Sequence, residues 1–224
     1  MKAVILAAGV GSRFRKQLPK SLIRLPVGYT IIANQIAMLR NTGVNEIIVV
    51  IGFKKELIME EISDVLFRYN PIYHITNTSQ SLRMAFESTE HDDVIWLNGD
   101  VYLDDTVISR IFNASGNTIA VNKSKCGEEE VKYKTDSNGR IVEISKKVQD
   151  AEGEAVGVNK ISKADFGTFV KCLQECSEND YFEMGIEFAI KKGIVFKPVD
   201  ISDCTCIEID FKKDLEQLEK ELQI

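Results

Sequence analysis

The first twenty residues place glycines and basic side chains directly after an apolar run. Residues 2–8 read KAVILAA, and Gly9, Gly11, Arg13 and Lys20 follow them. Glycines let backbone N–H groups approach phosphate oxygens closely, because no Cβ atom stands in the way. An arginine adds a planar fork for phosphate, and a lysine adds a movable point charge. The pattern therefore indicates either a phosphate-binding loop or a tight turn beside a solvated basic run.

This loop does not match the common nucleotide-binding fingerprints. It lacks the third glycine of the dinucleotide motif, and no G-K-[ST] triplet is present. No acidic ribose ligand stands at the end of the second apolar run, EIIVVIGF. A dinucleotide-dependent dehydrogenase is therefore the weakest alternative for this chain.

Three acidic residues stand where they could hold a cation. Asp100 ends the run VIWLNGD, and Glu208 and Asp210 lie two residues apart on a short predicted strand. Alternation along a strand should point the last two side chains to one face. Magnesium prefers oxygen ligands from one or a few carboxylates. An acid after a strand also commonly caps the next helix or a turn. We interpret Asp104 and Asp105 as ordinary loop or N-cap acids.

Composition limits the classes of partner. The 224 residues carry a formal net charge of -6, with 28 Lys and Arg against 34 Asp and Glu. Because nucleic-acid affinity depends on clustered cations, we expect no nucleic-acid partner and only a local anion site. The apolar opening is interrupted at Arg13, so we expect no membrane segment and a cytoplasmic location. The five cysteines are an odd number without C-x-x-C spacing, which favours free thiols over a zinc site.

The first half of the chain alternates predicted strands and helices. The strands cover residues 2–8, 44–53, 69–78 and 92–100, and the helices cover 30–43, 54–69 and 79–88. This alternation predicts βαβ units and a parallel sheet. Ligands bind beyond the carboxyl ends of the strands in such sheets, so the glycine loop and Asp100 should share one edge.

The second half has a different rhythm. Strands are predicted at 118–124, 131–148 (a hairpin), 155–166, 194–202 and 206–210, and helices at 167–176, 181–193 and 211–224. The predicted fold class is α/β, a Rossmann-like mixed, mostly parallel sheet flanked by helices. We predict a single domain over 1–224, with a nucleotide-binding half (1–110) and an acceptor-binding half (111–224) sharing one core.

The motif L-A-A-G-x-G-S-R, followed by P-K-S-L, resembles the signature of the sugar-nucleotide type of nucleotidyltransferase, the nucleotide-diphospho-sugar transferase fold. The resemblance extends over residues 28–53, 96–105 and 206–222. Within that superfamily the chain is most similar to the small bacterial phosphocholine and phosphonate cytidylyltransferases. Two departures, the short loop between Arg13 and Lys20 and the turn at residues 26–30, alter the rim of the nucleotide pocket.

The resemblance implies roles for the residues of the two motifs. Arg13 would clamp the β- and γ-phosphates, and Lys20 would stabilise charge at the α-phosphate. Asp100 and Asp210 would hold Mg²⁺, with Glu208 as a ligand or directly behind the ligands. The remaining nucleotide contacts would come from the first loop and the turn before Asp100, at Leu6, Ala7, Ala8, Gly9, Gly11, Ser12 and Gly99.

Polar residues before the third predicted helix are candidates for reading the base. They are Asn77, Ser79, Gln80 and Ser81, in a segment that lies against the nucleobase in relatives. Cytosine requires donors to O2 and N3 and an acceptor for its amine, which these side chains can supply. The same residues could instead cap the helix, and both roles are compatible.

The acceptor is expected to meet the second half of the chain. The candidates are Glu154, Asn159, Tyr133, Asp180, Tyr181 and Glu183. An acceptor with an ammonium or quaternary amine would suit an aromatic face with carboxylates nearby, and the two tyrosines with the last two acids fit that description. Tyrosines also commonly serve as packing residues.

These inferences lead to one functional hypothesis and its rivals. The resemblance implies a magnesium-dependent transfer of CMP from CTP to a small phosphorylated or phosphonate acceptor, such as phosphocholine or 2-aminoethylphosphonate, with release of pyrophosphate. The acceptor oxygen is already anionic, so positioning and electrostatics suffice. A sugar-1-phosphate uridylyl- or thymidylyltransferase is one alternative, and a catalytically silent nucleotide-sensing regulatory subunit is another. A homodimer also stays open.

Overall fold

Strands and helices alternate from the first residues onward. The structure is a computed structural model that describes residues 1–10, 18–124, 126–127 and 130–223. Its strands are β1 (Lys2–Ala7), β2 (Glu46–Ile51), β3 (Leu66–Tyr69), β4 (Val94–Asn98), β5 (Val101–Leu103), β6 (Asn117–Asn122), β7 (Lys132–Thr135), β8 (Ile141–Ser145), β9 (Gly153–Ile161), β10 (Phe196–Asp200) and β11 (Cys206–Glu208). Its helices are the 3-10 turn η1 (Lys20–Leu22), α1 (Ile31–Asn41), α2 (Lys55–Glu61), α3 (Thr78–Glu87), α4 (Asp105–Asn113), α5 (Lys163–Gln174), α6 (Phe182–Lys191) and α7 (Lys212–Leu222).

Within the described residues the main sheet has nine strands. Its order is β10-β6-β9-β4-β1-β2-β3, and the hairpin β7–β8 joins it along β9. β1 to β4 are parallel, β10 is parallel to β6, and β9 runs antiparallel to both of its neighbours β4 and β6. The prediction of a mixed, mostly parallel sheet in a single domain is confirmed. β5 and β11 form a separate antiparallel pair beside it.

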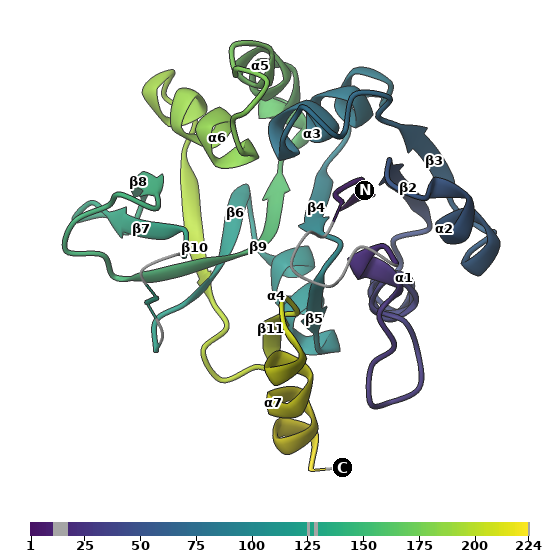
Figure 1. Cartoon of the computed structure of the whole chain (residues 1–224). Helices are drawn as coiled ribbons and strands as arrows, with labels where there is room; N and C mark the ends of the chain where they lie inside the picture. The colour runs from purple at the N-terminus through teal and green to yellow at the C-terminus, as the bar shows by residue number, and fades with distance from the viewer. Residues whose placement is uncertain (11–17, 125, 128–129, 224) are drawn as a thin grey trace.

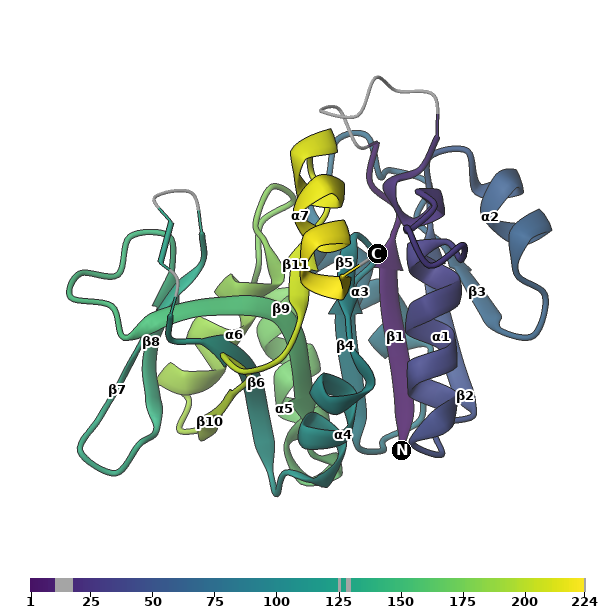
Figure 2. The ribbon, with the colours of Figure 1, turned by 90° about the horizontal axis from the view of Figure 1, so that it is seen from below.

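The core lies on both faces of the sheet. Alternate residues of β1 face opposite ways, with Val4 in one apolar cluster and Ala3 and Ile5 in the other. α3, α5 and α6 cover the first face, and α1, α2 and α4 contribute to the second, as Figure 1 shows. α7 packs through Leu218 onto a smaller cluster beside β5 and β11. The hairpin β7–β8 lies at the far side of the molecule from α2 (Figure 2).

The region around β3 differs from the sequence prediction. A helix over 54–69 and a strand over 69–78 are both wrong, because α2 ends at Glu61 and β3 covers Leu66–Tyr69. β3 pairs with β2 in parallel register, and this tertiary pairing overrides the helical pattern of the segment. The following residues form turns around the buried Asn70, whose Oδ1 accepts from the Ile72 N–H at 3.0 Å.

Two elements after β4 were absent from the sequence prediction. β5 and α4 occupy Val101–Leu103 and Asp105–Asn113. Asp104 caps α4 by accepting hydrogen bonds from the N–H groups of Thr106 and Val107, at 2.9 and 3.2 Å. The interpretation of Asp104 as a capping acid is confirmed. In the part of the chain that the structure describes, no helix is long and apolar enough to cross a membrane.

Candidate active site

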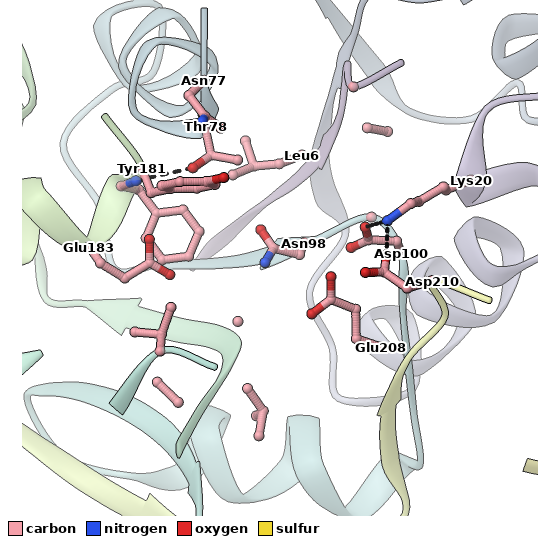
Figure 3. Close-up of a pocket in the computed structure, with 18 of the residues that line it drawn as sticks. Leu6, Lys20, Asn77, Thr78, Asn98, Asp100, Tyr181, Glu183, Glu208 and Asp210 are labelled. Atoms are coloured by element: carbon pink, nitrogen blue, oxygen red, sulfur yellow. Dashed lines mark hydrogen bonds and ion pairs between the residues drawn. The ribbon is translucent and has the colours of Figure 1, made fainter. Parts of the chain in front are cut away.

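A cavity of about 480 Å³ lies at the carboxyl ends of β1 and β4. Its walls come from β1, η1, the β4–β5 turn, β9 and the N-termini of α3 and α6. Figure 3 shows an acidic cluster at one end and Tyr181 with Glu183 at the other, with Asn98 between them. This is the sheet edge at which the sequence placed a ligand site.

The acidic cluster forms because two short strands pair. β11 runs antiparallel to β5, which sets Glu208 opposite Val101, directly after Asp100. The Ile209 N–H also donates to the Asp100 carbonyl at 2.9 Å. As a result, carboxylate oxygens of Asp100, Glu208 and Asp210 lie within 4.8 Å of one another.

The segment after β11 is fixed by the start of α7. The carboxylate of Asp214 accepts hydrogen bonds from the backbone N–H groups of Asp210 and Phe211, at 2.8 and 2.6 Å. This arrangement is a capping interaction at the helix N-terminus. It fixes the backbone that carries Asp210.

Lys20 lies between two of the carboxylates. Its Nζ is 3.0 Å from Asp100 Oδ2 and also contacts Asp210 Oδ1. Burial opposes the charged ammonium, but the charges and hydrogen bonds of Asp100 and Asp210 outweigh it and raise the pKa of Lys20. At Glu208, desolvation of the carboxyl and then the charges of Asp100 and Asp210 raise the pKa, although part of the side chain is exposed.

The acidic cluster fits a divalent cation. Among the described residues it offers three carboxylates against the ammonium of Lys20, and all of its candidate ligand atoms are oxygens. Oxygen ligands and an excess of negative charge are what Mg²⁺ selects in proteins. This cluster is therefore the candidate metal site.

A buried glutamine holds the turn that carries Asp100. Gln35 is fully buried on α1, and its Nε2 donates to the carbonyls of Asn98 and Val101, both at 2.8 Å. A Cβ atom on Gly99 would lie 2.8 Å from the Leu6 carbonyl, so the turn requires glycine there. Sequence reasoning missed Gln35, although a polar residue on the apolar face of a helix was a usable signal.

The residues of the first loop divide into two groups. Leu6, Ala7 and Gly9 line the cavity, together with Gly99 from the turn after β4. Ala8 is buried, and its carbonyl accepts from the Phe53 N–H at 3.1 Å. The remaining predicted loop residues lie outside the described residues, namely Gly11, Ser12 and Arg13.

Of the four candidates for reading the base, Asn77 lines the cavity and also caps α3 through its Oδ1. The other three are buried. Ser79 donates to the Ser177 carbonyl at 3.5 Å, and Ser81 Oγ accepts from the Asn70 Nδ2 at 3.1 Å. The Nε2 of Gln80 donates to the carbonyls of Cys176 and Ser177, both at 3.3 Å. These side chains therefore fix the start of α3 rather than face the cavity.

The starts of α3 and α6 are joined directly. Thr78 Oγ1 accepts a hydrogen bond from the Phe182 N–H at 3.1 Å, and the Ser79 N–H donates to the Asp180 carbonyl at 3.3 Å. Asp180 Oδ2 accepts from the Ser177 N–H at 2.7 Å, which closes the turn before α6. The segments predicted separately for base and acceptor thus form one joint. Thr78, which sequence reasoning passed over, lines the cavity within it.

The acceptor candidates are dispersed. Tyr181 and Glu183 line the cavity, and Glu154 lies on β9 directly before its cavity-lining stretch. Asn159 is almost fully buried within β9, opposite Trp96 of β4. Tyr133 is fully buried in the core. Its predicted role as an aromatic face for the acceptor is therefore wrong, because no part of the ring reaches a ligand.

Glu183 lies at the end of the cavity opposite the acidic cluster, and its carboxylate is only partly hydrogen-bonded. Its Oε2 is buried and has no hydrogen-bond partner among the described residues. Desolvation raises the pKa of Glu183 to about 7, although its own backbone N–H and the charge of Lys146 lower it. Lys146, which sequence reasoning missed, lines the cavity with its Nζ 5.7 Å from the centre of the Tyr181 ring.

Comparisons with known proteins show what the chain is similar to. The profile of the MobA-like NTP transferase domain matches residues 3–156. The CTP:phosphoglutamine cytidylyltransferase of Campylobacter jejuni is 28% identical, over 98% of this chain and 100% of that protein. The CMP-5'-(3-aminopropyl)phosphonate synthase of Streptomyces rubellomurinus is 25% identical over 97% of this chain, which spans 38% of that longer protein.

A solved structure shows the same fold. The CTP:phosphocholine cytidylyltransferase from Streptococcus pneumoniae aligns with a TM-score of 0.80 and 22% identity, covering 99% of this chain and 98% of that chain. Sugar-phosphate nucleotidyltransferases are also among the similar proteins.

Proposed function

Because the chain belongs to the MobA-like NTP transferase domain family, we propose that it transfers a cytidylyl group from CTP to a small phosphorylated or phosphonate acceptor. The observation that carries the proposal is the contact of Lys20 with Asp100 and Asp210 at one end of a cavity. The choice of CTP rests on two cytidylyltransferase-type relatives that match nearly the whole chain.

In this reaction an anionic oxygen of the acceptor attacks the α-phosphorus of CTP. A new P–O bond forms, the bond between the α-phosphorus and the bridging oxygen breaks, and pyrophosphate leaves with that electron pair. No general base is needed because the attacking oxygen carries no proton. The protein contributes orientation and electrostatic stabilisation.

Asp100 and Asp210, with Glu208 beside them, are the residues that would hold Mg²⁺. The ion, when bound, neutralises the triphosphate and polarises its oxygens. The Lys20 ammonium is close enough to this cluster to stabilise the charge that develops at the α-phosphate. We assign Arg13 to the β- and γ-phosphates from its place in the motif.

The rest of the cavity supplies orientation. Leu6, Ala7, Gly9 and Gly99 form the wall next to the cluster, where the triphosphate and ribose would lie. We propose Asn77 as a base contact, with the buried hydrogen bonds of Ser79, Gln80 and Ser81 fixing the start of α3 behind it. Tyr181 and Glu183 would then meet the acceptor.

Pyrophosphate release tests the proposal. The purified protein with Mg²⁺ is given each of the four nucleoside triphosphates and a panel of phosphomonoesters, phosphonates and sugar 1-phosphates. We expect release with CTP and an amino-alcohol phosphate or an aminoalkylphosphonate. Release only with UTP or dTTP and a sugar 1-phosphate would contradict it.

A sugar-1-phosphate uridylyltransferase is the second candidate. It is favoured by a uridylyltransferase of Haloferax volcanii that is 25% identical over 100% of this chain. The same panel separates the two, because they differ in base and acceptor and share the cluster. Thermal stabilisation by nucleotide without pyrophosphate release would instead favour a regulatory subunit.

A further inference from the structure

The cavity end opposite Lys20 contains an acceptor atom without a donor. Glu183 is the second residue of α6, and its carboxylate points into the cavity in Figure 3. Its Oε2 is buried without a hydrogen-bond partner among the described residues. Leaving a buried polar atom unpaired is unfavourable, so a ligand that brings a donor to this atom gains more than one that does not.

The aromatic surface at this end is small. Tyr181 is 51% exposed, whereas the neighbouring Phe182 is 1% exposed and Tyr133 is fully buried. Among the described residues that line the cavity, Tyr181 thus offers the one substantially exposed ring. Quaternary ammonium groups are bound mainly by several aromatic faces, and they carry no N–H donor. This end of the cavity is poorly equipped for such a group.

The charges at this end favour a cation next to Glu183. The burial that raises the pKa of its carboxyl to about 7 disfavours the charged form, and a bound cation would offset that cost. Lys146 offsets only part of this cost, because its charge lowers the pKa of Glu183 less than burial raises it and its side chain is exposed. Solvent and salt screen its charge.

We infer that Glu183 selects acceptors whose end remote from the phosphate carries an ammonium group with at least one N–H, such as a primary amine, and that it discriminates against quaternary ammonium groups. This inference rests on the proposed cytidylyl transfer and names the class of acceptor for it. The ammonium donates an N–H to Oε2 of Glu183, while its methylene chain lies against the Tyr181 ring.

A methylation series tests the inference on the unaltered protein. With CTP and Mg²⁺, kcat/KM is measured for ethanolamine phosphate, its N-methyl and N,N-dimethyl forms, and choline phosphate. A second series uses 2-aminoethylphosphonate and its N-trimethyl form. Only the quaternary members lack every N–H. Because hydrogen bonds to charged groups contribute about 1.5–3 kcal/mol, we expect kcat/KM to fall about 10- to 100-fold at the quaternary step.

Two matched variants assign the effect to its residue. Glu183→Gln keeps the size and removes the charge, so the drop at the quaternary step should shrink to about threefold or less. Tyr181→Phe keeps the ring and should preserve the drop.

The outcomes separate the two proposals. Choline phosphate used as well as ethanolamine phosphate would overturn the inference and leave cytidylyl transfer standing. A preference for the primary amine that persists in Glu183→Gln would overturn the role of Glu183. Pyrophosphate release with CTP and a phosphorylated acceptor without an amine, but with none of the amine-bearing acceptors, would overturn the inference and leave cytidylyl transfer standing. If no acceptor gives release in the presence of CTP, the proposed function is overturned and the inference with it.

Discussion

At one end of the cavity, Lys20 places its ammonium against Asp100 and Asp210, whereas at the other end the Oε2 of Glu183 lacks a donor among the described residues. The first end carries a counter-charge within the protein itself. At the second end, only a bound ligand could donate a hydrogen bond to the Oε2 of Glu183, as far as the described residues show. In the proposed reaction, the charge pair lies where the nucleotide reacts, and the acceptor meets a carboxyl whose Oε2 has no donor of its own among the described residues.

The two ends of the cavity are supported in the same way from within the core. Each is supported by a buried glutamine whose Nε2 donates to two backbone carbonyls. Gln35 supports the turn that carries Asp100, with both distances at 2.8 Å. Gln80 supports the turn before α6, because its Nε2 donates to the carbonyls of residues 176 and 177, both at 3.3 Å. The ends can therefore be perturbed separately through equivalent substitutions.

The largest effect is expected from breaking the charge pair. Lys20→Ala removes the cation next to the α-phosphate position, and we expect turnover with CTP to fall about 10²- to 10³-fold. Steady-state pyrophosphate release measures this. Lys123→Ala is the matched control, because Lys123 pairs with Asp200 on the exposed surface, 3.2 Å away. Near-normal turnover in Lys20→Ala would remove Lys20 from the catalytic machinery.

A smaller effect is expected from the unpaired carboxyl in the absence of ligand. The pKa of Glu183 in the folded protein is about 7, above its ordinary value of 4.5, so the folded state binds more protons between these pH values. The free energy of unfolding contributed by this group is therefore lost as pH rises from 4.5 to 7. At 1.36 kcal/mol per pKa unit, the loss is on the order of 3 kcal/mol.

Glu183→Gln isolates this contribution. Chemical denaturation of both proteins between pH 5 and pH 8 should show the variant gaining stability relative to the parent protein as pH rises. If the difference in free energy of unfolding between the two proteins stays constant over this range, the pKa of Glu183 is not raised in the folded protein.

The end of the cavity that contains Lys20 and the acidic cluster was largely predictable from the sequence. The carboxyl ends of adjacent parallel strands share one edge of a sheet, so the glycine loop and Asp100 could be placed together. The side-chain alternation expected for Glu208 and Asp210 puts both beside Asp100 in the structure. These inferences depend on local periodicity and on one topological rule.

The other end was less predictable because its contacts join distant segments. The hydrogen bond from the Phe182 N–H to Thr78 spans 104 positions, and no local pattern announces it. Tyr133 seemed suited to a ligand by residue type, but the pairing of its strand with β9 turns the ring into the core. Burial of a single carboxylate atom, as in Glu183, follows from tertiary packing alone.

The smallest expected effects come from the two glutamines. Gln35→Met and Gln80→Met keep the length of the side chain and remove both hydrogen-bond donors. The substitutions take donors away from buried carbonyls, although the Ser177 carbonyl keeps the Asp180 N–H, so we expect each variant to lose about 1–3 kcal/mol of stability in chemical denaturation.

The kinetic consequences of these two substitutions should differ. Gln35→Met loosens the turn that holds Asp100, so we expect kcat to fall about tenfold with every acceptor. Gln80→Met loosens the joint before α6, so we expect KM for the acceptor to rise about three- to tenfold with kcat nearly unchanged. Full steady-state kinetics in both substrates separates the two patterns. Equal effects on kcat from both variants would mean that the cavity responds as one unit, because a site with independent ends cannot transmit the loss of Gln80 to Asp100.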